Sequence, residues 1–353
     1  MSDLKERFRT LDRIPAPDLW TNIERREPAD LSLGPSWGRI GVATLALVMA
    51  AAGVFVAVRA FVVGNGSRVV VSPPPVAKGN GEIAFVRGPR SAHPTIYVVR
   101  SDGKGLEKLA SPGAGAFDPA WSPDGTRIAF VAGAPLNIYV MKADGSGIRR
   151  LSRCDPPPCE DNQPAWSPDG RRLAFVRFGD IYVMNADGSS VRRLTHAPTP
   201  LGDGQPAWSP DGTRIAFVVL REAPGNVPAI YLMNADGTGV RKLTRCVGEG
   251  CLDSQPSWSP DGKQIAFIRD RGIEIMTYNG AGAATLVQCS RIGSCVALSQ
   301  PEWSPDGTRI AFTLARADSR SQLLTIQLDS GEITALLPAK LDVCCPSWQP
   351  IPK

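Results

Sequence analysis

Cysteine is the residue type whose spacing most suggests chemistry in this chain. The sequence contains eight cysteines but only two histidines, His93 and His196. Six of the cysteines form local pairs with four or five residues between them: Cys154 and Cys159, Cys246 and Cys251, Cys289 and Cys295. Because this spacing is not C-x-x-C and no histidine stands nearby, we expect three disulfides that staple loops outside the cytoplasm, and no metal site. The adjacent Cys344 and Cys345 are compatible with either a vicinal bridge or two thiols.

A second set of polar residues recurs immediately before a Pro-x-Trp motif. Its members are Asp118, Gln163, Gln205, Gln255 and Gln300, with Cys345 at the sixth position. Four glutamines in the same register could form a polar ring that binds a peptide or a small ligand. They could equally lock neighbouring structural units together by hydrogen bonds, and the sequence does not choose between these two roles.

These residues belong to an internal repeat, which is the strongest signal in the sequence. The unit P-x-W-S-P-D-G-x-x-(I/L)-A-F occurs five times, and a sixth tryptophan follows. The tryptophans are 42 to 50 residues apart: Trp121, Trp166, Trp208, Trp258, Trp303 and Trp348. Each unit predicts four short strands joined by an S-P-D-G turn, a varied loop and an Asp-Gly turn. The period and the strand number are typical of a propeller blade, so we predict an all-β, six-bladed β-propeller over residues 81–350.

The two ends of the repeat region complement each other. Ile83-Ala84-Phe85 lacks a preceding tryptophan strand, whereas Trp348 lacks a following Ile-Ala-Phe strand. We therefore expect the C-terminal strand to join residues 82–110 in one blade, which closes the ring and leaves no open edge.

Blade topology predicts where a ligand would bind. The short turns share one face, and the longer loops, such as 152–163 and 219–229, share the other. The cysteine pairs fall in these long loops, so we expect a stiffened face that binds a protein or peptide. The alternative is a hydrolase or lactonase site in the channel that uses Asp161, Asp203 and Asp253, but no nucleophile–base pair supports it. We expect no catalytic residue and no cofactor.

The N-terminal part predicts a membrane anchor. Residues 39–63 contain an uncharged apolar run that is long enough to cross a bilayer as one helix. The polar segment before this run is far too long for the n-region of a cleaved signal peptide. Arg25, Arg26 and Arg39 precede the run, which places the N-terminus in the cytoplasm and the propeller outside it. Residues 64–80 are rich in Gly, Ser and Pro and are expected to be a linker.

The segment 1–38 has a helical pattern of its own. Leu4, Phe8, Leu11 and Ile14 have the spacing of one helix face. We expect a juxtamembrane amphipathic helix that lies on lipid. The alternative is a docking helix for a cytoplasmic partner such as a sigma factor, which would make the protein a transmembrane sensor.

The repeat resembles that of a known family. The run PAWSPDGTRIAFV, followed by IYVMNADG and RRLT, is similar to the repeat of the TolB-type β-propeller family over roughly residues 81–350. The resemblance implies an extracytoplasmic propeller that binds protein partners, as the propeller of TolB does in the Tol–Pal system. Similar propellers precede the hydrolase domain of prolyl-oligopeptidase-like enzymes. We do not expect a role in the Tol–Pal system here, because the anchor is predicted to be uncleaved. We do not expect a peptidase role either, because the sequence ends at Lys353 without a hydrolase domain.

Charge and composition add little specificity. The formal net charge is only +5, which makes no strong case for nucleic acid. The leading expectation is a single-pass membrane protein whose propeller binds a protein or peptide. The oligomeric state is not determined by the sequence.

Overall fold

The computed structural model describes most of the region in which the sequence predicts a propeller. The described residues are 81–88, 93–109, 115–153, 160–196, 202–220, 227–245, 252–292, 295–318 and 320–351. The predicted cytoplasmic segment 1–38, membrane helix 39–63 and linker 64–80 lie outside them. Within the described ranges, no helix is long and apolar enough to span a membrane.

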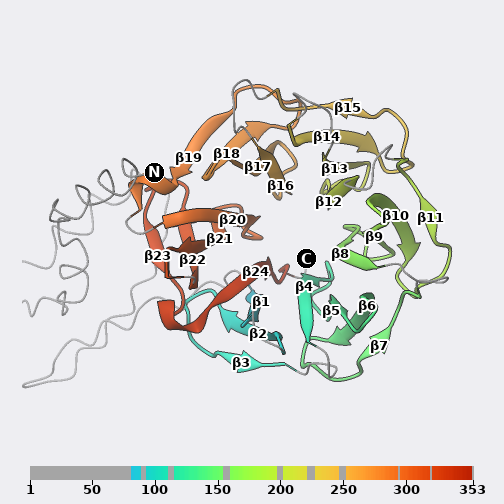
Figure 1. Ribbon diagram of the computed structural model, residues 1–353, viewed down its shortest axis with the longest axis horizontal. Coiled ribbons are helices and arrows are strands. Elements are labelled where there is room, and N and C mark those ends of the chain that lie inside the picture. The colour runs from blue at the N-terminus through green and yellow to red at the C-terminus, as the bar shows by residue number, and fades with distance from the viewer. Residues whose placement is uncertain are drawn as a thin grey trace, which may run out of the picture. The chain divides into compact units, whose positions relative to one another are not determined.

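The described residues form six four-stranded antiparallel sheets around a common centre (Figure 1), so the predicted six-bladed all-β propeller is confirmed. Blades are numbered here in chain order. Blade 1 comprises β24 (Val343–Trp348), β1 (Glu82–Arg87), β2 (Thr95–Arg100) and β3 (Glu107–Lys108). Blade 2 comprises β4 (Ala116–Trp121), β5 (Arg127–Ala132), β6 (Asn137–Lys142) and β7 (Arg149–Arg150). Blade 3 comprises β8 (Asp161–Trp166), β9 (Arg172–Arg177), β10 (Asp180–Asn185) and β11 (Arg192–Arg193).

The second half of the chain repeats this pattern. Blade 4 comprises β12 (Asp203–Trp208), β13 (Arg214–Val219), β14 (Ala229–Asn234) and β15 (Arg241–Lys242). Blade 5 comprises β16 (Asp253–Trp258), β17 (Gln264–Arg269), β18 (Gly272–Thr277) and β19 (Ala284–Gln288), followed by the 3₁₀ helix η2 (Cys289–Arg291). Blade 6 comprises β20 (Cys295–Trp303), β21 (Arg309–Arg316), β22 (Ser321–Gln327) and β23 (Ile333–Ala335), and the 3₁₀ helix η3 (Ala339–Leu341) leads to β24.

The hydrophobic core lies between the blades. The second strand of each blade carries the Ile-Ala-Phe motif, and its phenylalanine is at most 1% exposed in every blade: Phe85, Phe130, Phe175, Phe217, Phe267 and Phe312. These strands are covered on both faces by neighbouring blades, which explains their nearly continuous apolar sequence. The outermost strands, such as β7 and β11, are short, basic and exposed, as expected for edges that must not pair with another chain.

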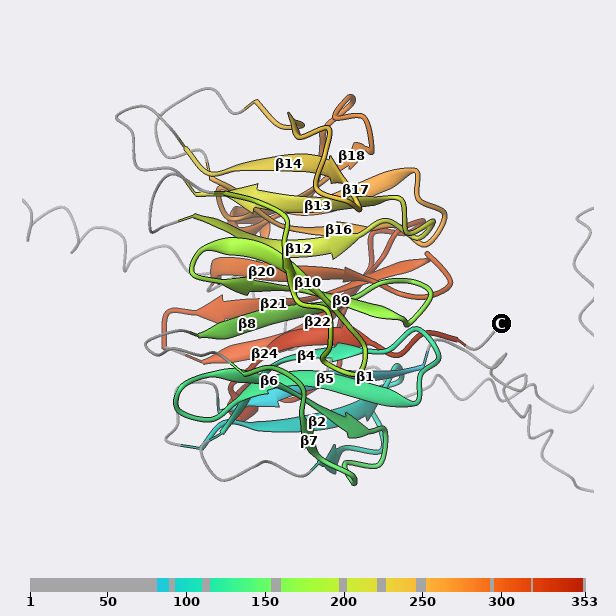
Figure 2. The ribbon, with the colours of Figure 1, turned by 90° about the vertical axis from the view of Figure 1, so that its right-hand side faces the viewer.

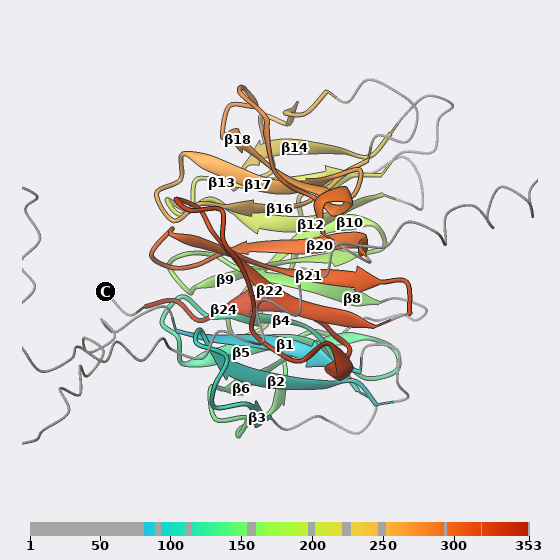
Figure 3. The same ribbon diagram turned by 90° about the vertical axis from the view of Figure 1, so that its left-hand side faces the viewer.

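The ring closes as the sequence predicts. Strand β24 pairs antiparallel with β1, so the last strand of the chain completes the first blade (Figure 3). Just after β24, Gln349 donates its backbone N–H to the carbonyl of Glu82 at 2.7 Å and accepts from the Glu82 N–H at 3.1 Å. Its Nε2 reaches the carbonyl of Gly125 in blade 2 at 3.0 Å. The C-terminal segment therefore closes blade 1 and also links blade 1 to blade 2.

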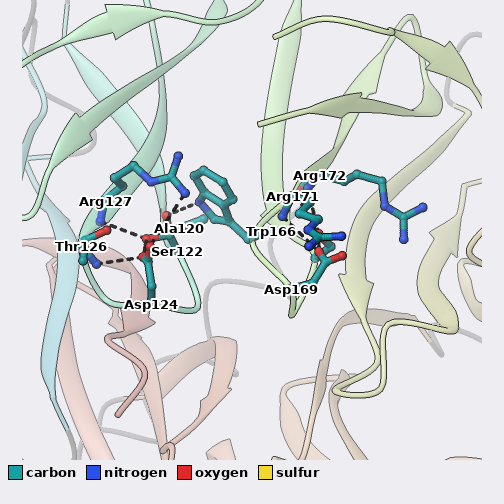
Figure 4. Close-up of polar contacts among 10 residues, drawn as sticks. Ala120, Ser122, Asp124, Thr126, Arg127, Trp166, Asp169, Arg171 and Arg172 are labelled. Carbon is teal, nitrogen blue, oxygen red and sulfur yellow. Dashed lines mark hydrogen bonds and ion pairs between the residues drawn. The ribbon is translucent and has the colours of Figure 1, made fainter. Parts of the chain in front are cut away.

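The S-P-D-G turns also link neighbouring blades. In blade 2, Asp124 Oδ1 accepts hydrogen bonds from Ser122 Oγ at 2.5 Å and from the Thr126 N–H at 3.0 Å, which closes the turn (Figure 4). The turn leads directly into Arg127, whose guanidinium lies 4.7 Å from the ring centroid of Trp166 in blade 3. The repeat therefore encodes a cation–π contact between blades as well as a turn within one.

The connections between strands gather at two opposite faces (Figure 2). The S-P-D-G and Asp-Gly turns lie on one, the tight-turn face. The connections from second to third strands and from blade to blade lie on the other, the long-loop face.

Candidate functional site

The inner strands of the blades surround a cavity of about 220 Å³ on the propeller axis. It is lined by the residues that precede each Pro-x-Trp, together with the prolines that follow them: Asp118, Gln163, Gln205, Gln255, Gln300 and Cys345. The structure thus brings together all five candidate ligand-binding residues of the sequence, and adds Cys345 at the sixth position. Since each inner strand begins at the long-loop face, this cavity lies in the half of the channel nearer that face.

The six residues of this ring share an unusual backbone conformation. Their φ angles lie between 46° for Asp118 and 63° for Cys345, in the left-handed region that non-glycine residues rarely adopt. In each inner strand the following proline disfavours the right-handed helical conformation, and a β-bulge shifts the register at this point, for example between Asn162 and Ala165. Because the same conformation occurs at the same place in every blade, the repeat itself enforces it.

The glutamine side chains form a chain of hydrogen bonds from blade to blade. The Oε1 atom of each accepts the backbone N–H of the next ring residue, at 2.8 Å from Gln163 to Gln205 and 2.7 Å in the following steps: Gln205 to Gln255, Gln255 to Gln300 and Gln300 to Cys345. The Gln163 N–H is in turn bonded to Asp118. The locking role that the sequence left open is therefore present. It uses only the amide oxygens, and the four Nε2 groups have no hydrogen-bond partner among the described residues.

Asp118 is the acidic member of the ring. Burial raises the pKa of its carboxyl group above the ordinary value, and the hydrogen bond from the Gln163 N–H works against that rise. Asp118 therefore supplies a side-chain acceptor for the backbone N–H of the next blade, as a glutamine does, while adding a titratable group to the channel.

Glu302 is a channel residue that sequence reasoning missed. It occupies the middle position of Pro-x-Trp, where the other blades have only alanine or serine: Ala120, Ala165, Ala207, Ser257 and Ser347. Its Oε2 accepts a hydrogen bond from Ser257 Oγ at 3.2 Å, and burial raises the pKa of its carboxyl group to about 7. The available signal was that Glu302 is the single ionisable residue at this position of the repeat.

A second cavity of about 330 Å³ continues the channel toward the tight-turn face. Prolines and tryptophans of the Pro-x-Trp motifs line it, and Glu302 lines both cavities. Three of the tryptophans donate their indole N–H to the carbonyl of the preceding blade at 3.1 Å: Trp166 to Ala120, Trp258 to Ala207 and Trp348 to Glu302. These bonds fix the wall of the channel on its tight-turn side.

The carboxylates proposed for an enzymatic alternative are placed elsewhere. Asp161 is fully buried and forms two hydrogen bonds with the Arg177 guanidinium, at 2.6 and 2.8 Å. Asp253 is paired in the same way with Arg269, at 2.7 and 2.9 Å. Neither these two nor Asp203 is among the described residues that line the axial cavities. In the described part of the chain, no three His, Cys, Asp or Glu side chains come together as a metal site.

Two disulfides are present among the described cysteines. Cys289 and Cys295 are bonded, with 5.3 Å between their Cα atoms, which confirms one predicted pair. Cys344 and Cys345 form a vicinal disulfide, so the open question at this site is answered in favour of the bridge. The other predicted pairs, Cys154 with Cys159 and Cys246 with Cys251, lie outside the described residues.

The vicinal disulfide interrupts the glutamine ring at the closure seam. Cys345 donates its backbone N–H to Gln300 Oε1 at 2.7 Å, but its own side chain has no oxygen to offer the next blade. The ring of amide acceptors therefore ends where the last strand of the chain meets the first blade.

Comparisons with known proteins agree with this geometry. A family model described as the TolB beta propeller domain matches residues 57–199 and 197–351. The Tol-Pal system protein TolB of Anaeromyxobacter dehalogenans (strain 2CP-C) is 35% identical over 80 residues, which are 22% of this chain and 18% of that protein. The matched segment therefore spans less than a fifth of this curated relative.

Solved structures show the same architecture. TolB from Acinetobacter baumannii superposes with a TM-score of 0.62 at 23% identity, over 77% of this chain and 67% of that one. Oligogalacturonate lyase from Vibrio parahaemolyticus superposes with a TM-score of 0.50 at 14% identity, over 72% of this chain and 74% of that one. At such identities the likeness shows the fold alone, and the fold hosts both binding proteins and enzymes.

Proposed function

Because this chain belongs to the TolB β-propeller domain family, we propose that its propeller is a rigid, non-catalytic binding module for a protein or peptide outside the cytoplasm. The observation that carries the proposal is the axial cavity with its ring of strained, hydrogen-bonded polar residues. A ring that is already held by bonds between blades loses little conformational entropy when a ligand binds.

The polar chemistry of the cavity suits a peptide. The amide nitrogens of Gln163, Gln205, Gln255 and Gln300 are donors that could meet backbone carbonyls of an inserted segment. The carboxyl groups of Asp118 and Glu302 are acceptors in the same cavity. A peptide carries donors and acceptors in alternation, which this lining complements.

Two observations support a non-catalytic role. Asp161 and Asp253, two of the three carboxylates in the enzymatic alternative, form buried ion pairs with Arg177 and Arg269. The carboxyl groups that do line the cavity, Asp118 and Glu302, stand without a histidine or a lysine beside them in the described lining. A histidine or lysine beside a carboxyl group is a common arrangement for general acid–base catalysis, and the described lining lacks it.

The extracytoplasmic location rests on chemistry at both ends of the chain. A disulfide such as Cys289–Cys295 persists in an oxidising compartment. Residues 39–63 supply an apolar run of membrane-spanning length, with arginines on its N-terminal side. We therefore propose a single-pass anchor with the propeller outside. The test fuses, after Ile351, a phosphatase that works only outside the cytoplasm. We expect the fusion protein to show phosphatase activity, and a well-expressed fusion without activity would contradict this topology.

Photo-cross-linking in intact cells tests the binding face on the full-length chain. Phe178 is 60% exposed in the short connection between β9 and β10, which lies on the long-loop face, and Val191 is 43% exposed on the tight-turn side of the same blade. Replacing each in turn by a photoreactive phenylalanine places matched probes on opposite faces of blade 3. We expect one discrete cross-linked partner from position 178, lost when Gln205 is changed to Glu, and none from position 191. Equal cross-linking from both positions would refute the assignment of the face.

A further inference from the structure

We propose that Glu302 recognises a cationic group of the bound protein or peptide, a primary ammonium or guanidinium that enters the channel along the propeller axis. The inference rests on the proposed binding function and names the chemistry of the ligand at that site.

The position of Glu302 is the first argument. It lines both the 220 Å³ cavity on the long-loop side and the 330 Å³ cavity on the tight-turn side. It therefore stands where the two halves of the channel meet.

The charge of the channel is the second argument. Among the described residues that line the two cavities, Asp118 and Glu302 are the ionisable side chains besides the bonded cysteine, and no lysine or arginine is present. Low-dielectric walls focus the field of a carboxylate along a channel, so the interior favours positive groups and disfavours negative ones.

The bonding state of Glu302 is the third argument. Oε2 has one long hydrogen bond, from Ser257 Oγ at 3.2 Å, and Oε1 has no partner among the described residues. A carboxylate in this state is stabilised only weakly by its surroundings, which is why burial raises its pKa to about 7. A bound cation would supply the stabilisation that a proton supplies in the empty channel.

The neighbours of Glu302 match the shape of an alkylammonium. At the same register, the adjacent blades 5 and 1 carry the hydroxyl groups of Ser257 and Ser347, whereas the three blades opposite carry Ala120, Ala165 and Ala207. Ser347 Oγ already accepts the Trp121 N–H at 3.1 Å and Ser257 Oγ donates to Glu302, and each hydroxyl oxygen keeps a lone pair for an ammonium, which has three donors. The other half of this ring offers methyl groups to the attached methylenes.

A metal ion fits this lining less well. No three His, Cys, Asp or Glu groups gather in the described residues, and the glutamine oxygens that could assist already accept backbone N–H groups. Ca²⁺ and Mg²⁺ take six or more oxygen ligands, which the surroundings of a single carboxyl do not provide.

The test uses n-butylammonium as probe and n-butanol as its neutral counterpart, with the full-length chain in detergent micelles and calorimetry as readout. We expect butylammonium to bind at pH 8, butanol not to bind, and the affinity to fall roughly tenfold at pH 6 as Glu302 takes up a proton. Glu302→Gln should abolish binding of the probe. Glu332→Gln, a change at an exposed glutamate of the same blade, should leave the affinity unchanged.

Several results would overturn the proposal. One is undiminished binding of butylammonium to Glu302→Gln, provided that the circular dichroism of the variant matches that of the parent. The others are an affinity that does not change between pH 6 and pH 8 and equal binding of butanol. Displacement of butylammonium by micromolar calcium chloride would assign the site to a metal instead.

The two proposals can fail separately. Suppose that position 178 cross-links its partner equally well in the Glu302→Gln variant and that butylammonium does not bind the parent protein. The cation site is then wrong, and the binding module stands. If butylammonium binds as expected but no partner is ever cross-linked, the binding module is wrong and the cation site stands.

Discussion

Replacing Gln205 by alanine separates the two roles of the glutamine ring. Gln205 Oε1 accepts the backbone N–H of Gln255 at 2.7 Å, and alanine removes that acceptor while the N–H stays in the partly buried channel wall. A buried donor left without a partner costs about 1–3 kcal/mol. For a domain of this size, such a loss lowers Tm by roughly 2–4 °C for each kcal/mol.

Glutamate at position 205 is the matched variant. It retains a side-chain oxygen for the Gln255 N–H and replaces the Nε2 donors by the second oxygen of an ionisable carboxyl group. Asp118 shows that the repeat already accommodates an acid at this register. We therefore expect Gln205→Glu to lose much less stability than Gln205→Ala, while losing the cross-link from position 178 to the same extent.

Urea unfolding of the full-length chain, followed by tryptophan fluorescence, measures the free energies. Parallel cross-linking measures binding. If the free energy of unfolding of Gln205→Ala is within about 0.3 kcal/mol of the parent value, the amide oxygens do not lock the blades, because loss of a required acceptor has a larger destabilising effect. If Gln205→Glu loses stability but binds normally, the assignment of the Nε2 groups to the ligand is wrong.

Three further outcomes follow from the structure. Deleting residues 343–353 removes the partner strand of β1 and should abolish cooperative unfolding, and an unchanged melting transition would contradict closure by β24. Arg177→Met leaves Asp161 buried and unpaired, so we expect a loss of about 3–5 kcal/mol, most of which the added change Asp161→Leu should restore in urea titrations. The pKa of Glu302 is about 7 in the folded protein against an ordinary 4.5, so between these pH values the folded state binds one more proton than the unfolded state. The stabilisation from this proton is present at low pH and is lost as pH rises through 7. Glu302→Gln should remove this fall of at most about 3 kcal/mol between pH 5 and pH 8, and identical slopes for variant and parent would contradict the raised pKa.

Much of the fold was predictable because it is repeated. Five copies of one turn motif at a nearly constant period specify strand order, blade number and the two faces without any long-range reasoning. The closure by β24 was predictable too, because Trp348 and Ile83-Ala84-Phe85 are the two halves of one unit at opposite ends of the chain. The contacts between blades were harder to predict from the sequence. Arg127 stacks on Trp166, for example, and no short-range sequence pattern relates these two residues.

The site was predictable only as a set of positions. The sequence placed Asp118 and the four glutamines in one register but could not choose between locking and binding, because both roles need the same residue type. At the four glutamines, the side-chain oxygen bonds to the neighbouring blade and the amide nitrogen has no hydrogen-bond partner among the described residues. Glu302 went unnoticed because a single glutamate in a strand is ordinary until the ring closes around it.

The sequence by itself determined the architecture of this protein, the disulfide between Cys289 and Cys295, and the one repeat position that supplies Asp118 and the four glutamines around the axis. Local turn chemistry and hydrophobic periodicity are sufficient for that. Only the tertiary structure decided what those residues do, because the role of a polar side chain depends on what it meets across the channel. Asp161 and Glu302 are both carboxylates, yet one meets an arginine within its own blade and the other meets a cavity.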